Sequence, residues 1–482
     1  MSTMQVQVVM VVMRILCKLL LIPSYHSTDF EVHRNWLAIT HSVPIHLWYQ
    51  QASPSIWTLD YPPYFAYFEF LLSQFAVRVD PKMIQVDALN YASHACVYFQ
   101  RISVILMDTL FQYFSAAYLN SHPYALHIFC LLLFNPCLLI IDHIHFQYNG
   151  FLIGILIACF YFAKFEKYVY LTHSFCVLIL LKHLFLPLVP LFAIYLLRQY
   201  CRLSITSSHI HFNIQRFLIL VLIACCHLLL AFGPFMLQSN PAEQLTAILT
   251  RLFPFERGLT HAYWAPNVWA IYSFVDYFGH IFYHKLFKIP YKAPGYVSGL
   301  VGNHSFTWLP NISPMTSLIL VIIAIIPALI KIYHSPTSIN LIKGTFHTTF
   351  SAFMLGYHVH EKAILVPLIC SVLISFESRK SCEMMLHMMI PAIFSVFPLL
   401  IQPAEIMTKL SLSISYLVLQ RMLPRDKLTL SHLRCFHSLI VAFLNQIWFV
   451  DGRICNWFCA LGHSFFMRLF IPCCFMIPAY YH

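Results

Sequence analysis

The chain has 482 residues, of which 60% are hydrophobic and only 10% are charged. Soluble domains carry about a quarter charged residues, so this composition excludes a soluble protein and predicts a polytopic membrane protein. The formal net charge of +11 is spread over short clusters, which indicates membrane orientation rather than nucleic-acid binding. The 16 cysteines lie mostly within apolar runs and indicate buried apolar positions rather than a disulfide framework.

Apolar segments suited to crossing a bilayer recur along the whole chain. A span takes about 20 helical residues. We expect a single membrane-embedded, all-α domain over residues 1–482 with roughly 11–15 transmembrane helices. The predicted spans are 6–22, 98–119, 125–141, 150–165, 168–181, 184–197, 217–237, 315–332, 344–356, 363–376, 384–400, 406–419, 433–450 and 460–477, with 267–282 ambiguous between spanning and interfacial.

The first predicted span carries two basic residues. Arg14 and Lys18 are four residues apart and therefore share one helical face. A central Arg or Lys costs roughly 3 kcal/mol when it faces lipid, so this face should point into the bundle. Asp108 in the second span is expected to neutralise a basic group there.

Basic loops set the expected orientation. Lys164–Lys167, Arg198–Arg202, Arg379-Lys380 and Arg421–Lys427 form a plausible cytosolic set. Alternation then places the segments 25–97, 142–149, 182–183, 238–266 and 358–362 on the opposite side of the membrane. Because unusual polar residues collect in these separate loops, the pattern favours an enzyme site on one membrane face. A transporter, which would show charges at mid-bilayer and repeated halves, is the alternative from another class.

The long loop over residues 23–97 shows two helical patterns. One follows Thr28 and Asp29 and the other follows Pro62-Pro63, and both predict amphipathic helices on the membrane surface. Two interpretations of Asp29 stay open from the residues alone: a helix N-cap or a reactive carboxylate. Glu31 and Arg34 form either an exposed i,i+3 pair or part of a site, and Asp60 either starts a turn or belongs to the same site.

Further polar clusters lie on the same predicted side. His143 and His145, within the stretch 141–149, indicate a metal pair, a hydrogen-bonding surface for sugar or phosphate, or a polar turn. His360 and Lys362 stand in a loop with four ionisable groups in five residues, which is costly at a bilayer boundary unless they are paired or functional. Other candidate cations for a phosphate are Lys18, Lys182, His183, Arg251 and Arg257.

Several motifs resemble one enzyme family. The run Asp29-Phe30-Glu31-Val32-His33-Arg34-Asn35-Trp36 resembles the dolichyl-phosphate-glucose-dependent α-1,3-glucosyltransferases of asparagine-linked glycosylation. So do residues 57–63, 141–149, 251–255 and 358–365, and the resemblance runs with gaps from about residue 15 to 365. Within the family, the amino-acid sequences of residues 29–36 and 261–267 resemble those of the branch that adds the second glucose.

The resemblance implies a GT-C fold, an endoplasmic reticulum membrane location and a luminal active site in the 23–97 loop. It implies transfer of glucose from dolichyl phosphate glucose to the Glc1Man9GlcNAc2 oligosaccharide on a dolichyl pyrophosphate carrier. The family's catalytic aspartate matches Asp29. The first-glucose enzyme, acting on Man9GlcNAc2, is the near alternative.

The expected mechanism is one inverting displacement. A single carboxylate base, Asp29, takes the proton from the acceptor hydroxyl, and no metal or other cofactor is required. His360 and Lys362 are the first candidates to bind the donor phosphate, followed by Lys182, His183, Arg251, Arg257 and Lys18. Asp60, Glu31, Arg34, His143 and His145 are candidates for positioning the acceptor. Glu256 and residues 302–305 depart from the family pattern, and residues 378–482 are expected to be a divergent transmembrane region.

Overall fold

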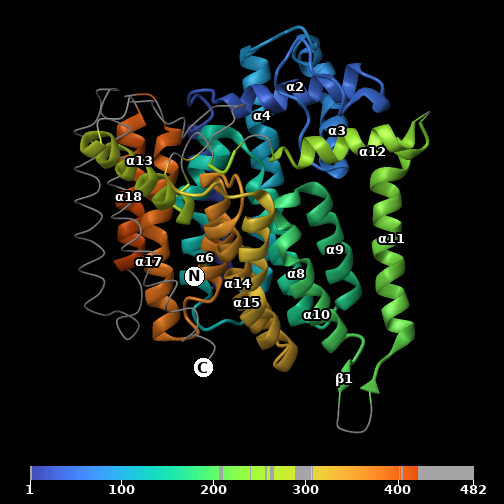
Figure 1. Cartoon of the computed structure of the whole chain (residues 1–482), viewed down its shortest axis with the longest axis vertical. Coiled ribbons are helices and arrows are strands. Elements are labelled where there is room, and N and C mark those ends of the chain that lie inside the picture. Colours follow the sequence, from blue (N-terminus) through green and yellow to red (C-terminus); the bar gives the residue numbers. More distant parts are fainter. Residues whose placement is uncertain are drawn as a thin grey trace. The chain divides into compact units, whose positions relative to one another are not determined.

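A computed structural model describes residues 3–205, 210–238, 240–255, 258–260, 265–287, 306, 308–400, 402 and 405–421 (Figure 1). The chain divides into two compact units. Unit 1 comprises residues 1–254 and 336–341, and unit 2 comprises residues 255–335 and 342–482. Each unit is described by itself.

The described residues of unit 1 form helices and one short hairpin. Its helices before the hairpin are α1 (Thr3–Leu20), α2 (Thr28–Ser42), η1 (Ile45–Leu47), α3 (Pro63–Val79), η2 (Pro81–Ile84), α4 (His94–Met107), α5 (Thr109–Leu119), α6 (Ala125–Leu133), α7 (Pro136–Leu138), the π-helix η3 (Leu139–Phe146), α8 (Asn149–Lys164), α9 (Tyr168–Leu181), η4 (His183–Leu188) and α10 (Val189–Gln199). The antiparallel strands β1 (Ser204–Ile205) and β2 (Ile210–His211) follow, and then α11 (Ile214–Met236) and α12 (Pro241–Leu252).

The described part of unit 2 is also built from helices. They are α13 (Val268–Phe287), α14 (Pro314–His334), α15 (Ser338–Leu355, which begins in unit 1), η6 (Glu361–Ile364), α16 (Leu365–Leu373), α17 (Arg379–Val396), η7 (Phe397–Leu399) and α18 (Ile406–Arg421). The Trp269 indole of α13 donates to the Gly356 carbonyl at 2.8 Å, just beyond the end of α15.

The all-α membrane fold is confirmed. Five described segments are long and apolar enough to cross a membrane: 94–119, 125–146, 214–236, 314–334 and 379–399. Three shorter apolar helices cover 149–164, 168–181 and 183–199. The predicted spans at 433–450 and 460–477 lie outside the described residues, so the total of 11–15 spans stays a prediction. Residues 268–282 of the ambiguous segment lie within the helix α13.

Two local signals interrupt the third predicted span. Asn135 caps α7, since its side-chain oxygen accepts from the backbone N–H of Cys137 at 3.0 Å. Pro136 supplies the first residue of that helix, where its missing N–H costs nothing. The chain then continues as the buried π-helix η3. Residues 142–146 were expected in a polar loop, and they lie in this helix instead.

Small residues bring α8 against α5. Gly150 and Gly154 are one turn apart on α8, and both face α5 or its N-terminal neighbour Asp108. A Cβ atom on Gly154 would lie 2.6 Å from the backbone nitrogen of Phe111. Such small-residue spacing lets transmembrane helices approach closely.

Gly154→Ala is expected to lower the unfolding temperature of the purified protein, because overpacking against a rigid backbone costs about 1–3 kcal/mol. Gly233→Ala on α11 is the matched control, since a Cβ atom there meets nothing within 4 Å. Thermal unfolding in detergent measures both. Equal unfolding temperatures for the two variants would contradict the packing argument.

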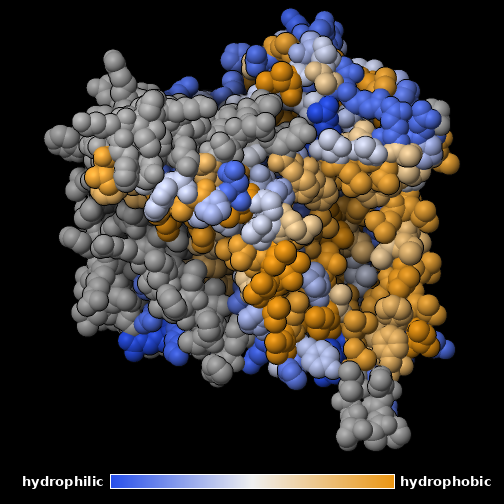
Figure 2. Space-filling view, in the orientation of Figure 1, coloured by the Kyte–Doolittle hydropathy of each residue, from blue (hydrophilic) through white to orange (hydrophobic). Residues whose placement is uncertain are grey.

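The polar segments of unit 1 gather at one end of its helices. Figure 1 places α2, α3 and α12 at one end and the β1–β2 hairpin at the other. Figure 2 shows α11 as a hydrophobic column, with hydrophilic residues gathered at the end that carries α12. Within unit 1, segments 25–97 and 238–254 therefore lie at the end of the helices opposite residues 198–202. The membrane side that each end faces stays a prediction.

The segment 23–97 contains both predicted helices, but α2 is not a surface helix. Residues 30–31 and 33–40 are buried, because α3, η2 and η3 pack around them. In contrast, α3 buries Glu69 and Ser73 while Leu71 and Phe75 are 61% and 59% exposed. Only α3 therefore presents the apolar outer face expected of an interfacial helix.

Candidate active site

Asp29 lies in the first turn of α2. Ser27 occupies the N-cap position and Asp29 the second helical position, so the N-cap interpretation of Asp29 is wrong. The amide of Gln147 donates to Asp29 Oδ2 at 2.5 Å, and His145 Nε2 lies 3.4 Å from the same oxygen. A helix N-terminus stabilises negative charge. The Asp29 side chain is 20% exposed, which leaves it reachable by a substrate.

Arg101 fixes the π-helix beneath this carboxylate. Its guanidinium donates to the carbonyls of His143 at 2.6 Å and Ile144 at 2.9 Å, and to that of Tyr25 at 3.0 Å. Ser27 Oγ donates to the carbonyl of His145. These bonds join the segment just before α2 to η3, so two side chains, Arg101 and Ser27, hold Asp29 and His145 together through backbone carbonyls.

A chain of amides continues inward from Asp29. Gln147 Oε1 accepts from the Asn149 side chain at 2.8 Å, and Asn149 also donates to Asp142 Oδ1 at 2.9 Å. Lys182 Nζ donates to Asn149 Oδ1 at 3.2 Å. Three predicted loops, at residues 23–97, 142–149 and 182–183, therefore meet at one polar cluster.

Tyr61 forms one wall of the cluster. The Lys182 ammonium lies 4.9 Å from the centroid of its ring. Burial raises the pKa of Tyr61 well above its usual value, and the charges of Asp60 and Asp29 raise it further. Asp60 directly precedes Tyr61 in the sequence, which places it next to this wall of the cluster.

Glu31 and Arg34 were proposed as acceptor-positioning residues, but both are buried. Arg34 makes a bidentate ion pair with Glu31 at 2.8 Å for both bonds. The same guanidinium donates to the carbonyls of Met83 at 3.1 Å and Gln85 at 3.0 Å. This geometry ties α2 to η2, so their role here is to hold the segment together.

Three other candidates have distinct surroundings. His143 is 3% exposed and its backbone carbonyl accepts from Arg101, which points away from acceptor positioning. The His183 ring packs against Phe253, with ring centroids 5.7 Å apart. Arg251 Nε donates to the Tyr49 carbonyl at 3.2 Å. Of the cations predicted in unit 1, Lys182 is the one joined to Asp29 through Gln147 and Asn149.

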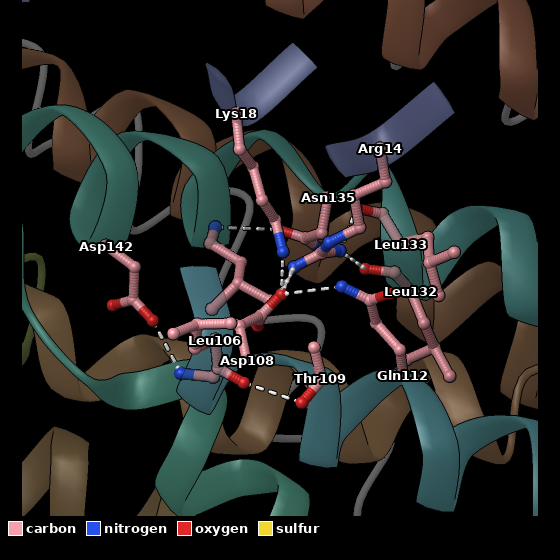
Figure 3. Close-up of polar contacts among 12 residues, drawn as sticks. Arg14, Lys18, Leu106, Asp108, Thr109, Gln112, Leu132, Leu133, Asn135 and Asp142 are labelled. Atoms are coloured by element: carbon pink, nitrogen blue, oxygen red, sulfur yellow. Dashed lines mark hydrogen bonds and ion pairs between the residues drawn. The ribbon is translucent and has the colours of Figure 1, made fainter. Parts of the chain in front are cut away.

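Lys18 belongs to a buried cluster around Asp108, which lies beside Asp142 (Figure 3). Arg14 donates to Asp108 Oδ2 at 2.9 Å, and Lys18 donates to the same oxygen. Arg14 also donates to the carbonyl of Leu133 at the end of α6, where helical carbonyls lack partners. The prediction that Asp108 neutralises the first span is confirmed, since Asp108 pairs with both Arg14 and Lys18.

The remaining candidates belong to unit 2. The backbone N–H of His358 donates to the Leu259 carbonyl at 2.9 Å, and Val359 bridges to Thr260. His360 is the N-cap residue of η6, and Lys362 lies within it. Both side chains are half-buried. Arg257, with Glu256 and residues 302–305, lies outside the described residues.

The Asp29 cluster offers a partly exposed carboxylate, a neighbouring imidazole and one ammonium group. In the described ranges, no three His, Cys, Asp or Glu side chains are grouped to hold a metal ion. Gln147, Asn149 and Arg101 were missed as site residues. The stretch 141–149 signalled the two amides, whereas nothing in the sequence indicated that Arg101 would bind the backbone of η3.

Comparison with known proteins assigns the family. A model of the ALG6, ALG8 glycosyltransferase family matches residues 14–476. The chain belongs to this family. It is 44% identical over 415 residues to the dolichyl pyrophosphate Glc1Man9GlcNAc2 alpha-1,3-glucosyltransferase of Neurospora crassa, covering 83% of this chain and 81% of the relative. The mouse protein of the same name is 41% identical over 423 residues, covering 84% and 79%.

Membership in this glycosyltransferase family identifies the chain as a membrane-embedded transferase and argues against the transporter interpretation. The match also runs past residue 378 to residue 476, into the region expected to be divergent. Asp29 and its partners Gln147 and His145 all lie within the residues that the family model matches.

Proposed function

We propose that the chain transfers glucose from dolichyl phosphate glucose, in α-1,3 linkage, to Glc1Man9GlcNAc2 carried on dolichyl pyrophosphate. The relatives' names support this acceptor. The observation that carries the catalytic part is the Asp29 carboxylate, which is partly exposed and held by Gln147 and His145.

Asp29 is proposed as the general base. The donor glucose is β-linked and the product is α-linked, so one displacement with inversion is sufficient. The acceptor hydroxyl loses its proton as its oxygen attacks the anomeric carbon, and a positioned carboxylate accepts that proton. The bond from that carbon to the phosphate oxygen breaks, and dolichyl phosphate leaves as an anion. Since phosphate is a good leaving group, the scheme requires neither an acid partner nor a metal.

Fixed positive charge should stabilise the departing phosphate. Lys182 is the best supported candidate, because its ammonium belongs to the Asp29 cluster. Five other cations stay proposals for this role: His360, Lys362, His183, Arg251 and Arg257. Lys18 is a weaker candidate, because its ammonium binds Asp108. Asp60 and His145 are proposed to position the acceptor.

The proposed location is the endoplasmic reticulum membrane, with the Asp29 cluster facing the lumen. The polar end of unit 1, which carries the cluster, supports a site on one membrane face. The cytosolic side would then carry the Arg198–Arg202 turn, as basic loops favour.

Acceptor profiling tests this function. Purified protein with synthetic dolichyl phosphate glucose is expected to extend the Glc1Man9 acceptor and to leave the Man9 acceptor unchanged. Extension of Man9 would instead identify the first-glucose enzyme. A related transferase of known acceptor serves as the control, and folded protein that extends neither acceptor would overturn the proposal.

A further inference from the structure

The hydrogen bonds behind Asp29 have a defined direction. An ammonium group only donates, so Lys182 requires the oxygen of the Asn149 amide to face it, at 3.2 Å. The nitrogen of that amide then faces Asp142 Oδ1 at 2.9 Å and Gln147 Oε1 at 2.8 Å. Gln147 therefore turns its own nitrogen toward Asp29. The contact of Asn149 with the Lys182 ammonium therefore sets the orientation of both amides.

The hydrogen-bonded series that runs from Asp29 to Asp142 is buried at its inner end. Asp142 is fully buried and also accepts from the backbone N–H of Gly150 at 2.5 Å. Gln147 and Asn149 are 8% and 6% exposed. A buried amide that cannot turn over presents a fixed donor, in contrast to a solvated side chain that samples both orientations.

We infer that Gln147 is a positioning residue for the transfer reaction, and that Asn149 sets the orientation in which it works. Gln147 holds Asp29 Oδ2 and thereby fixes the plane of the carboxylate before the acceptor hydroxyl arrives. Its N–H also stabilises the ionised carboxylate, which is the form that accepts a proton. This inference rests on the proposed role of Asp29 as the base.

The other polar groups near Asp29 contact the carboxylate less closely than Gln147 does or bind to other atoms. His145 lies 3.4 Å from Asp29, which is longer than a good hydrogen bond. Tyr61 and Asp60 come from the loop before α3, and after burial the charges of Asp60 and Asp29 raise the pKa of the Tyr61 hydroxyl. Lys182 and Asp142 each hydrogen-bond to Asn149. The bond from Gln147 to the Asp29 carboxylate, at 2.5 Å, is thus shorter than the contact with His145.

Gln147→Glu tests the inference because it keeps the size of the side chain and replaces the donor with an acceptor. We expect kcat to fall by about 10- to 100-fold, as loss of one charge-assisted hydrogen bond does, with the donor KM nearly unchanged. The acidic limb of the pH profile of kcat should move to higher pH, because two carboxylates that face each other retain a proton. Gln147→Ala should lower kcat similarly.

Asn149→Asp provides a second, independent variant. Its carboxylate would require Gln147 to turn its nitrogen inward, which leaves an acceptor facing Asp29. In a double-mutant cycle, Asn149→Asp should lower kcat strongly in the wild-type background and far less in the Gln147→Ala background. A purely structural role for Asn149 would instead give equal losses in both.

The control glutamine is Gln74 on α3, which contacts Phe70, Ser73 and His41. Gln74→Glu should keep the wild-type kcat and pH profile. Wild-type kcat and pH profile in Gln147→Glu, with Asp29→Asn inactive, would overturn the positioning role and leave the proposed function intact. Full activity in Asp29→Asn would overturn both. Thermal unfolding of each variant identifies losses that come from misfolding.

Discussion

Purified Asp29→Asn protein is expected to lose glucose transfer by about 10²–10⁴-fold, the usual cost of removing a general base. The amide has the shape of the carboxylate but cannot accept the proton of the acceptor hydroxyl. It can still hydrogen-bond to Gln147 and His145, which surround the carboxylate now, so the fold should be retained. The rate of transfer to the Glc1Man9 acceptor measures the effect.

Asp87→Asn is the matched control. Asp87 is an exposed carboxylate in the same 23–97 segment, and the identical substitution there should leave the transfer rate unchanged. If Asp29→Asn transferred glucose at a rate near that of Asp87→Asn, another residue would have to act as the base.

The sequence predicted the helices that are bounded by charged residues. Residues 168–181 were predicted as a span and form α9 with those bounds. The break at Asn135-Pro136 and the π-helix after it were not predicted, because a π-helix has no hydropathy signature of its own. The predicted span 184–197 corresponds to two short elements, η4 and α10, rather than to one continuous long helix.

The sequence located the candidate site more reliably than it assigned the roles around it. Asp29 and Lys182 were selected, and they lie in one cluster. Glu31 and Arg34 were expected to meet substrate, but a pair at i and i+3 looks the same whether it is exposed or buried. Only the packing of η2 against α2 shows that Arg34 binds backbone carbonyls.

Asp108→Asn is expected to destabilise the protein by about 3–5 kcal/mol, because it leaves the buried Arg14 and Lys18 without a compensating charge. Both cations are at most 1% exposed, so water cannot replace the carboxylate. Thermal unfolding of purified protein in detergent measures the loss.

Removing one cation together with the anion should restore part of this stability. Lys18→Met combined with Asp108→Asn is therefore expected to unfold at a higher temperature than Asp108→Asn alone, since it leaves one uncompensated charge instead of two. The same experiment tests the role of Lys18. If Lys18 acts only through Asp108, folded Lys18→Met protein should keep the wild-type KM for dolichyl phosphate glucose. A large rise in that KM without a loss of stability would instead indicate that Lys18 binds the donor phosphate.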